Sequence, residues 1–201
     1  MRILPAGDRA VLVELESLDA VLGYYAALAD SPPAGVIDIV PAARTVLVTT
    51  DGGDLSSLTR ALHAVQSVDG VQVGGDLLEI PVTYDGEDLP DLAGFLNCSI
   101  DDVIKRHTAE DWTVAFCGFS PGFGYLTGTG TWDIPRRKSP RTKVPTGAVA
   151  LAGEFSGVYP RESPGGWQLI GHTDLAIFDQ NRTPAALFHP GRHIRFTKAD
   201  N

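Results

Sequence analysis

The sequence predicts an α+β protein with a ferredoxin-like split βαβ domain at residues 1–82 and a β-rich domain at residues 83–201. Through residue 82 the predicted order is strand, helix, strand, strand, helix, strand, which is the order of the ferredoxin-like arrangement. From Trp112 onward, short strand-like segments are separated by glycine and proline, a pattern typical of a closed barrel or a sandwich. The polar turn Tyr84–Pro90 supplies a boundary between the two domains.

Four strands and two helices account for the first domain. Ser17 is the predicted N-cap of the first helix and Asp54 that of the second. The helices carry apolar stripes at i, i+3, i+4 spacing, formed by Leu18, Val21, Leu22, Tyr25 and Leu28 in the first and by Leu55, Leu58, Leu62 and Val65 in the second. The strands are predicted from apolar, β-branched runs at Ala10–Leu15, Val36–Val40, Thr45–Thr49 and Leu77–Val82.

The second domain begins with helices and continues with strands. Asp91–Leu96 is predicted as a short helix, and Ile100–His107 as a longer one that begins with a capping box formed by Ser99 and Asp102. The predicted short strands that follow are Val149–Ala152, Gly157–Tyr159, Trp167–Ile170, Ala176–Phe178 and His193–Phe196.

Length and composition indicate a globular protein. With 201 residues and 43% hydrophobic residues the chain has enough apolar material for a core. It contains no run of eighteen apolar residues, so we expect no membrane span. The segment Met1–Asp8 reaches a charged residue too early to be a signal peptide. We therefore expect a cytoplasmic protein.

The net charge of −9 is unevenly distributed along the chain. Residues 112–201 hold ten basic and six acidic residues, whereas the rest of the chain is strongly acidic. The acidic total argues against nucleic acid as a partner, because affinity for nucleic acid depends on neutralising phosphates. The basic excess in the second domain suits a small anionic ligand, although a solvated basic loop would show the same pattern.

Glycine is concentrated in one part of the chain. Eleven of the 22 glycines lie between Gly118 and Gly171, where they alternate with aromatic residues and prolines. Glycine loses more conformational freedom on folding than other residues, so this density indicates turns or backbone that approaches a ligand closely. The stretch Trp112–Thr173 is therefore predicted to be an ordered site built from loops.

The stretch contains no complete motif for hydrolysis, nucleotide binding or metal binding. Gly118–Gly122 matches the G-x-S-x-G pattern, but Pro121 has no N–H for an oxyanion hole, so Ser120 is not predicted to be a nucleophile. A P-loop is absent. The five histidines and two cysteines show no metal-binding spacing, and no metal is predicted in this chain. Cys117 as a nucleophile remains a minor alternative.

Basic and aromatic residues supply the candidate site. Five cations lie within eight residues, and Arg136 and Arg141 are candidates for binding an anion, with a subunit interface as the rival interpretation. His107 either caps a helix C-terminus or transfers protons, and His172 presents the same choice. Tyr125 and Trp167 either stack on a ligand or act as hydrophobic plugs.

Several motifs resemble the family of 5-oxoprolinase B subunits, which is also named allophanate hydrolase subunit 1 and includes a sporulation histidine-kinase inhibitor. The resemblance spans nearly the whole chain and rests on the motifs Gly118–Leu126, Pro135–Arg137, Ser139–Pro145 and Ser163–Gly171, supported by Gly7–Ala10, Val40–Pro41, Arg44–Val48 and Glu79–Val82. The sequence departs from the family pattern at His172, where arginine is usual, at Ala148, where serine is common, and at Arg192–His193.

The resemblance implies a cyclophilin-like barrel in the second domain and an enzyme assembled from several chains. The partners would be a second cyclophilin-like chain (the 5-oxoprolinase C subunit, or allophanate hydrolase subunit 2) and a third chain, the A subunit. Together they would use ATP to open 5-oxo-L-proline to L-glutamate, with allophanate as an alternative substrate, and this chain would be inactive alone. A regulatory protein that inhibits a histidine kinase is the alternative function.

The predicted site follows from these motifs. His107, Arg136 and Arg141 are the predicted catalytic residues: the arginines would bind an anion, and the histidine would assist proton transfer. The predicted substrate-binding residues are Phe119, Pro121, Gly122, Phe123, Tyr125, Pro145, Gly165, Gly166, Trp167 and His172.

Overall fold

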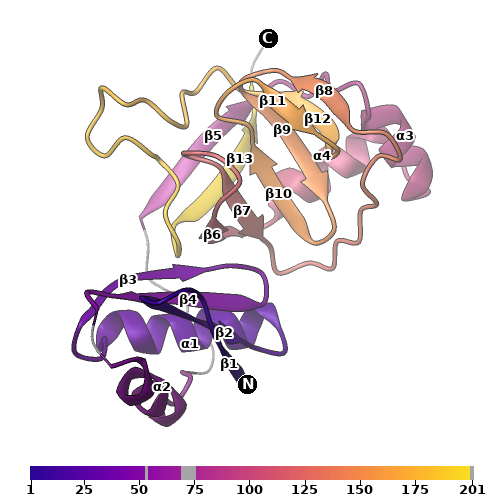
Figure 1. Cartoon of the computed structure of the whole chain (residues 1–201). Coiled ribbons are helices and arrows are strands. Elements are labelled where there is room, and N and C mark those ends of the chain that lie inside the picture. Colours follow the sequence, from indigo (N-terminus) through magenta and orange to yellow (C-terminus); the bar gives the residue numbers. More distant parts are fainter. Residues whose placement is uncertain (53, 69–75, 200–201) are drawn as a thin grey trace. The chain divides into compact units, whose positions relative to one another are not determined.

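The computed structural model describes residues 1–52, 54–68 and 76–199. The chain forms two compact units, Met1–Val73 and Gly74–Asn201, each with its own core (Figure 1).

The first unit is a four-stranded antiparallel sheet with two helices. Its elements are β1 (Arg2–Pro5), β2 (Ala10–Glu14), α1 (Leu18–Asp30), β3 (Val36–Pro41), β4 (Thr45–Thr50) and α2 (Leu55–Ala64), and the strand order is β1-β2-β4-β3. Alternate residues of β2 and β4 pack against buried residues of both helices, which are Val21, Tyr24 and Leu28 in α1 and Leu58 and Leu62 in α2. The Tyr24 hydroxyl of α1 donates to the Leu62 carbonyl of α2 at 2.7 Å, which joins the two helices.

The fourth strand of this sheet differs from the prediction. Strand β1 occupies the position beside β2, and it is joined to β2 by a short connection in which Gly7 has φ of +79°. Leu77–Val82 is β5 of the second unit, where it pairs in parallel with β13 (His193–Lys198). The prediction that this segment completes the first sheet is therefore wrong. The β1–β2 hairpin joins segments that are adjacent in the chain. It therefore supplies the edge strand of this sheet at a lower loop-closure entropy than a distant segment such as Leu77–Val82 would.

The second unit contains a seven-stranded sheet and a separate two-stranded ribbon. The sheet has the order β12-β9-β10-β7-β6-β13-β5, and the ribbon pairs β8 with β11. The strands not yet located are β6 (Trp112–Cys117), β7 (Gly124–Thr127), β8 (Arg141–Val144), β9 (Ala148–Ala152), β10 (Phe155–Val158), β11 (Ser163–Gly165) and β12 (Gln168–His172). Ala176–Phe178, predicted as a strand, contributes only an isolated bridge from Phe178 to Ala186.

The two edges of the seven-stranded sheet meet. Thr83, directly after β5, forms an antiparallel bridge with His172 of β12, with two backbone hydrogen bonds of 2.9 Å. The sheet thereby becomes a nearly closed barrel around a large apolar core that includes Ile80, Trp112 and Leu151. The α+β class is confirmed, and the second unit is a barrel rather than a sandwich.

Two helices pack on the barrel, α3 (Leu89–Phe95) against β12 and α4 (Ile100–Ala109) against β13. The predicted capping box is present, with the Asp102 N–H donating to Ser99 Oγ and the Ser99 N–H donating to Asp102 Oδ2, both at 3.1 Å. Within the described residues, no helix has the length and apolar character needed to cross a membrane.

The meeting point of the sheet edges requires glycine at position 171. A Cβ there would overlap the Thr83 carbonyl oxygen and lie 3.0 Å from Val82 Cγ1. We expect Gly171→Ala to lower the free energy of unfolding by about 1–3 kcal/mol, measured by urea denaturation, because forced overpacking costs that much. Gly94→Ala is the matched control, because a Cβ at Gly94 in α3 meets nothing within 4 Å. Equal stability of the two variants would contradict this account of the barrel closure.

Candidate functional site

A tight loop between β6 and β7 carries two aromatic side chains, Phe119 and Phe123. Phe119 has φ of +66° and is 58% exposed, which is unusual for a large apolar residue. Gly122 has φ of +83°, and a Cβ on it would lie 2.5 Å from Phe178 Cβ, so only glycine fits. Hydrogen bonds from the Gly118 N–H to the Phe123 carbonyl (3.1 Å) and from the Phe123 N–H to the Ser120 carbonyl (3.0 Å) close the loop.

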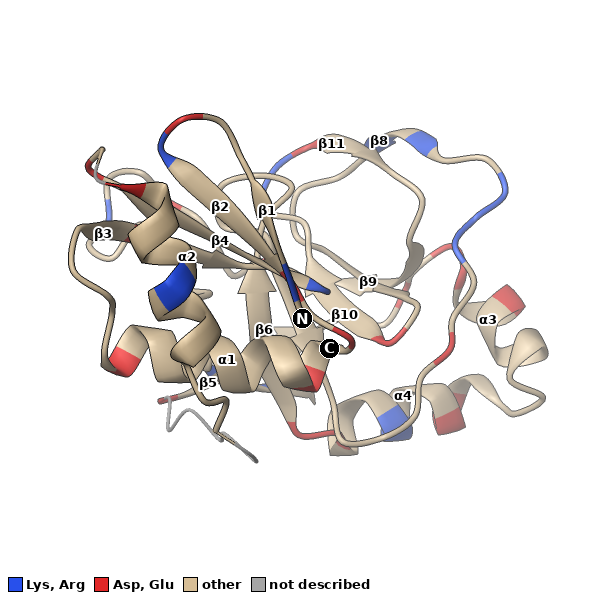
Figure 2. Cartoon of the chain, turned by 60° about the horizontal axis from the view of Figure 1, so that its bottom comes forward, with Lys and Arg blue, Asp and Glu red and all other residues tan. Residues whose placement is uncertain are grey.

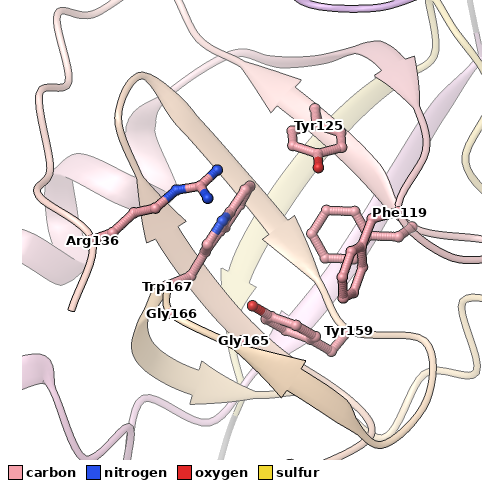
Figure 3. A pocket seen from close by; sticks show the side chains of 8 residues that line it. Phe119, Tyr125, Arg136, Tyr159, Gly165, Gly166 and Trp167 are labelled. Atoms are coloured by element: carbon pink, nitrogen blue, oxygen red, sulfur yellow. The ribbon is translucent and has the colours of Figure 1, made fainter. Parts of the chain in front are cut away.

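This loop forms one wall of a pocket of about 90 Å³. The lining residues, most of them labelled in Figure 3, are Phe119, Phe123, Tyr125, Arg136, Tyr159, Gly165, Gly166 and Trp167. Phe123 makes edge-to-face contacts with Tyr159 and Trp167, with ring centroids 5.3 and 5.4 Å apart. A Cβ on Gly165 would overlap the Tyr159 hydroxyl, so glycine lets the tyrosine approach this wall. The pocket is therefore aromatic and held in place by ring-to-ring packing.

Arg136 supplies the charge of the pocket. Its side chain extends toward Trp167 (Figure 3). It has no hydrogen bond or ion pair to any described residue, whereas Arg137 and Arg141 both pair with Asp88, and Lys143 lies 3.2 Å from Glu162. In Figure 2, blue marks Lys and Arg residues both on the segment that leads into β8 (Arg141–Val144) and on β8 itself. Arg136 is thus available to an external anion.

Arg141 already has an anionic partner within the chain. Its Nη1 and Nη2 atoms both lie 2.9 Å from the Asp88 carboxylate, and Nη2 is also 3.1 Å from Glu87. Only 14% of the Arg141 side chain is exposed. Arg141 does not line the pocket. The predicted role of Arg141 as a ligand-binding cation does not fit this geometry, because its two terminal nitrogens are already paired.

His107 is fully buried against the barrel core and does not line the pocket. Its Nδ1 lies 2.8 Å from the Tyr84 hydroxyl and its Nε2 lies 3.0 Å from Ser156 Oγ, and the ring stacks on Phe196. Burial lowers the pKa of His107 to about 3, against a smaller opposing effect of Glu110. A neutral imidazole enclosed in this way is not placed for the predicted proton transfer in the pocket.

The predicted substrate-binding residues divide into two groups. Six of them line the pocket: Phe119, Phe123, Tyr125, Gly165, Gly166 and Trp167. Pro121, Gly122, Pro145 and His172 do not line it. His172 instead joins the sheet edges and places Nδ1 2.8 Å from Asp85. Tyr159 is a pocket residue that the sequence reasoning missed, and its place one residue after the buried strand β10 was the only local signal.

Cys117 is not activated as a nucleophile. Burial raises the pKa of its thiol to about 11, and its Sγ lies 3.7 Å from the Phe188 carbonyl. We expect iodoacetamide at pH 7.5 to alkylate the exposed Cys98 and to leave Cys117 unmodified until the protein unfolds, because the thiolate is the reactive form. Mass spectrometry of tryptic peptides measures this, and rapid modification of Cys117 in the folded protein would contradict it.

The pocket is suited to binding rather than to independent catalysis. Among the described residues that line it, none carries a carboxylate, imidazole, thiol or amine, which are the usual general bases. The phenols of Tyr125 and Tyr159 are the other ionisable groups of this lining, and burial raises the pKa of Tyr159, which makes it a poorer base at neutral pH. Pockets for drug-sized ligands measure roughly 300–1,000 Å³, so this one is small by comparison. No three His, Cys, Asp or Glu side chains of the described residues gather as a metal site. The fold and site define an α+β barrel protein with a small aromatic pocket whose described lining residues include one arginine.

Comparison with known proteins supplies the family. The family described as carboxyltransferase domain, subdomain C and D, matches residues 1–188, and this chain belongs to it. The chain is 34% identical over 203 residues to the 5-oxoprolinase B subunit of Escherichia coli O157:H7, covering 94% of this chain and 92% of that protein. It is 32% identical over 216 residues to the 5-oxoprolinase B subunit of Bacillus subtilis (strain 168), covering 96% and 90%.

A solved structure agrees with the fold. The crystal structure of TTHA0988 superposes with a TM-score of 0.78 at 34% identity and covers 96% of this chain. This chain spans only 40% of that longer protein.

Proposed function

We propose that this chain is the B-type subunit of an ATP-dependent hydrolase that opens 5-oxo-L-proline to L-glutamate in the cytoplasm. Two relatives that it matches over nine-tenths of their length are named as B subunits of 5-oxoprolinase. The observation that carries the proposal is the pocket, in which an unpaired guanidinium faces aromatic walls and the described lining residues include no carboxylate, imidazole, thiol or amine.

The chemistry of the substrate suits this pocket. 5-Oxo-L-proline is a small ring with a planar amide and one carboxylate. Arg136 would bind the carboxylate, since a guanidinium presents a planar fork of donors that matches carboxylate geometry. Tyr125 and Trp167 would contact the ring, and the glycine wall at Gly165 and Gly166 leaves room for it.

The remaining chemistry is assigned to companion chains. Lactam opening requires a group that activates water and a site for ATP, and the pocket residues suit neither task. We therefore infer that this chain is inactive alone and assembles with a second cyclophilin-like chain, the C subunit, and with a third chain, the A subunit. ATP would bind on a partner, because this pocket is small and the sequence contains no P-loop.

Reconstitution tests the proposal. This chain is purified alone and together with the neighbouring subunits, and ATP-dependent release of glutamate from 5-oxoproline is measured by a coupled assay. We expect turnover from the complete set and none from any single chain. Turnover of allophanate but not of 5-oxoproline by the complete set would replace the substrate, and turnover without this chain would refute its role.

A further inference from the structure

The five basic side chains between Arg136 and Lys143 differ in their contacts. Arg137 and Arg141 pair with Asp88, Lys143 lies near Glu162, and Lys138 is exposed outside the pocket. Arg136 alone of the five lines the pocket. Asp88 pairs with two of these cations, Arg137 and Arg141, and lies 49 residues before Arg137 in the chain.

Asp88 is a buried carboxylate that accepts hydrogen bonds from two arginines and from a backbone N–H. Its side chain is 3% exposed, and it accepts hydrogen bonds from both terminal nitrogens of Arg141, from Nη1 of Arg137 and from the Leu169 N–H, the last at 2.7 Å. Burial on its own would raise the pKa of Asp88, but the hydrogen bonds from Arg141 and Leu169 outweigh it, so the pKa lies below the usual value. Asp88 is therefore ionised at neutral pH.

The same carboxylate joins both walls of the pocket. Through Arg137 and Arg141 it holds the segment that carries Arg136, and through Leu169 it holds the strand that follows Trp167. Two further bonds tie these walls together: the Arg137 N–H donates to the Gly166 carbonyl at 2.8 Å, and Gln168 Nε2 donates to the Pro135 carbonyl at 2.9 Å. The residues on either side of Arg136 are thus fixed, while its own guanidinium stays free.

We infer that Asp88 is the positioning residue of this pocket: it withdraws Arg137 and Arg141 from the ligand and leaves Arg136 as the single guanidinium that binds one carboxylate. Glu87 contributes a second negative charge near Arg141, so the two acids balance the two withdrawn arginines. A pocket with one available positive charge favours a monoanion over a dianion. This inference deepens the proposed function and rests on it for the identity of the natural ligand only.

Arginine side-chain NMR on the whole chain of 201 residues tests this inference. The Nε–Hε signals of Arg136, Arg137 and Arg141 are assigned by single Arg→Lys variants, and the wild type is titrated with acetate, a monoanion, and sulfate, a dianion. We expect acetate to shift Arg136 and to leave Arg137 and Arg141 unchanged. If neither anion shifts Arg136, or if Arg137 or Arg141 responds equally in the wild type, the inference is wrong.

Asp88→Asn removes the charge and keeps the shape of the side chain. We expect Arg137 and Arg141 to respond to anions in this variant, and the affinity for sulfate relative to acetate to rise about tenfold, which corresponds to about 1.4 kcal/mol. Glu87→Gln is the comparison, because it removes the exposed partner of Arg141 and leaves the buried Asp88 in place, so we expect a much smaller change in anion preference. An unchanged anion preference in Asp88→Asn would overturn the inference.

A second variant tests the inference if Asp88→Asn does not fold. Asp88→Asn/Arg141→Gln removes both members of the buried pair, and such double replacement costs less stability than leaving one charge alone. In this double variant we expect sulfate to shift the Nε–Hε signals of both Arg137 and Arg136. An unshifted Arg137 signal would overturn the inference. Titration with 5-oxoproline separates the two proposals: binding no tighter than acetate contradicts the proposed substrate and leaves the role of Asp88 standing.

Discussion

Arg136→Gln is expected to lower kcat/KM of the reconstituted complex for 5-oxoproline by about 10- to 100-fold, because a hydrogen bond to a charged group contributes about 1.5–3 kcal/mol. Among the described residues that line the pocket, Arg136 is the one with a charged side chain. Since the carboxylate is bound in both the ground state and the transition state, most of the loss should appear in KM.

Lys138→Gln is the matched control for this prediction. It removes the same charge two residues away, from an exposed side chain that does not line the pocket. Steady-state rates over a range of 5-oxoproline concentrations give kcat and KM for both variants. If Lys138→Gln loses as much as Arg136→Gln, the effect is a general one of surface charge, and Arg136 is not a direct ligand contact.

The choice between Arg136 and Arg141 shows where sequence reasoning ends. Both lie in the same basic, proline-containing segment, and both were predicted to bind an anion. Asp88 determines which arginine is left without an ion-pair partner. It lies in the turn before α3, and nothing in the local sequence indicates that it binds arginines. Long-range ion pairs depend on the tertiary arrangement, and no local pattern reveals them.

Local features of the fold were predictable, and strand pairing was less so. The N-caps Ser17, Asp54 and Ser99 each accept the expected backbone N–H groups, since capping depends on residues within one helical turn. Leu77–Val82 was recognised as a strand, but its partner β13 lies more than a hundred residues later. An apolar strand fits the edge of either sheet by its pattern alone, and the pattern did not decide between them.

The loop Gly118–Gly122 illustrates a similar limit within the site. Its glycine and aromatic content indicated an ordered pocket, and Phe119 and Phe123 do line one. Pro121 and Gly122 do not line it: the chain turns through positive φ at Phe119 and Gly122, and Gly122 lies against Phe178. Composition located the site, whereas the backbone angles determined which residues reach the ligand space.

His107 is expected to make the stability of the protein depend on pH well above the range in which carboxylates titrate. In the folded protein, burial lowers its pKa from 6.5 to about 3. The unfolded chain therefore binds a proton that the folded chain does not, at every pH between these values. The stabilisation from neutral His107 is present above pH 6.5 and is lost as the pH falls, by up to about 1.4 kcal/mol per pH unit.

The interval from pH 6.5 to 4.5 isolates this effect. Asp88 and Glu110 have pKa values below their ordinary 3.8 and 4.5, because burial, which would raise these values, is outweighed by their hydrogen bonds, so the stability they contribute is lost only at lower pH. Urea denaturation of the wild type should show unfolding free energies that decrease across the interval. His107→Gln should be less stable at pH 7, because the contacts with Tyr84 and Ser156 change, yet its stability should depend less on pH. Parallel pH profiles for the two proteins would mean that His107 has the same pKa in the folded protein as in the unfolded chain, and they would reopen a role for it in proton transfer.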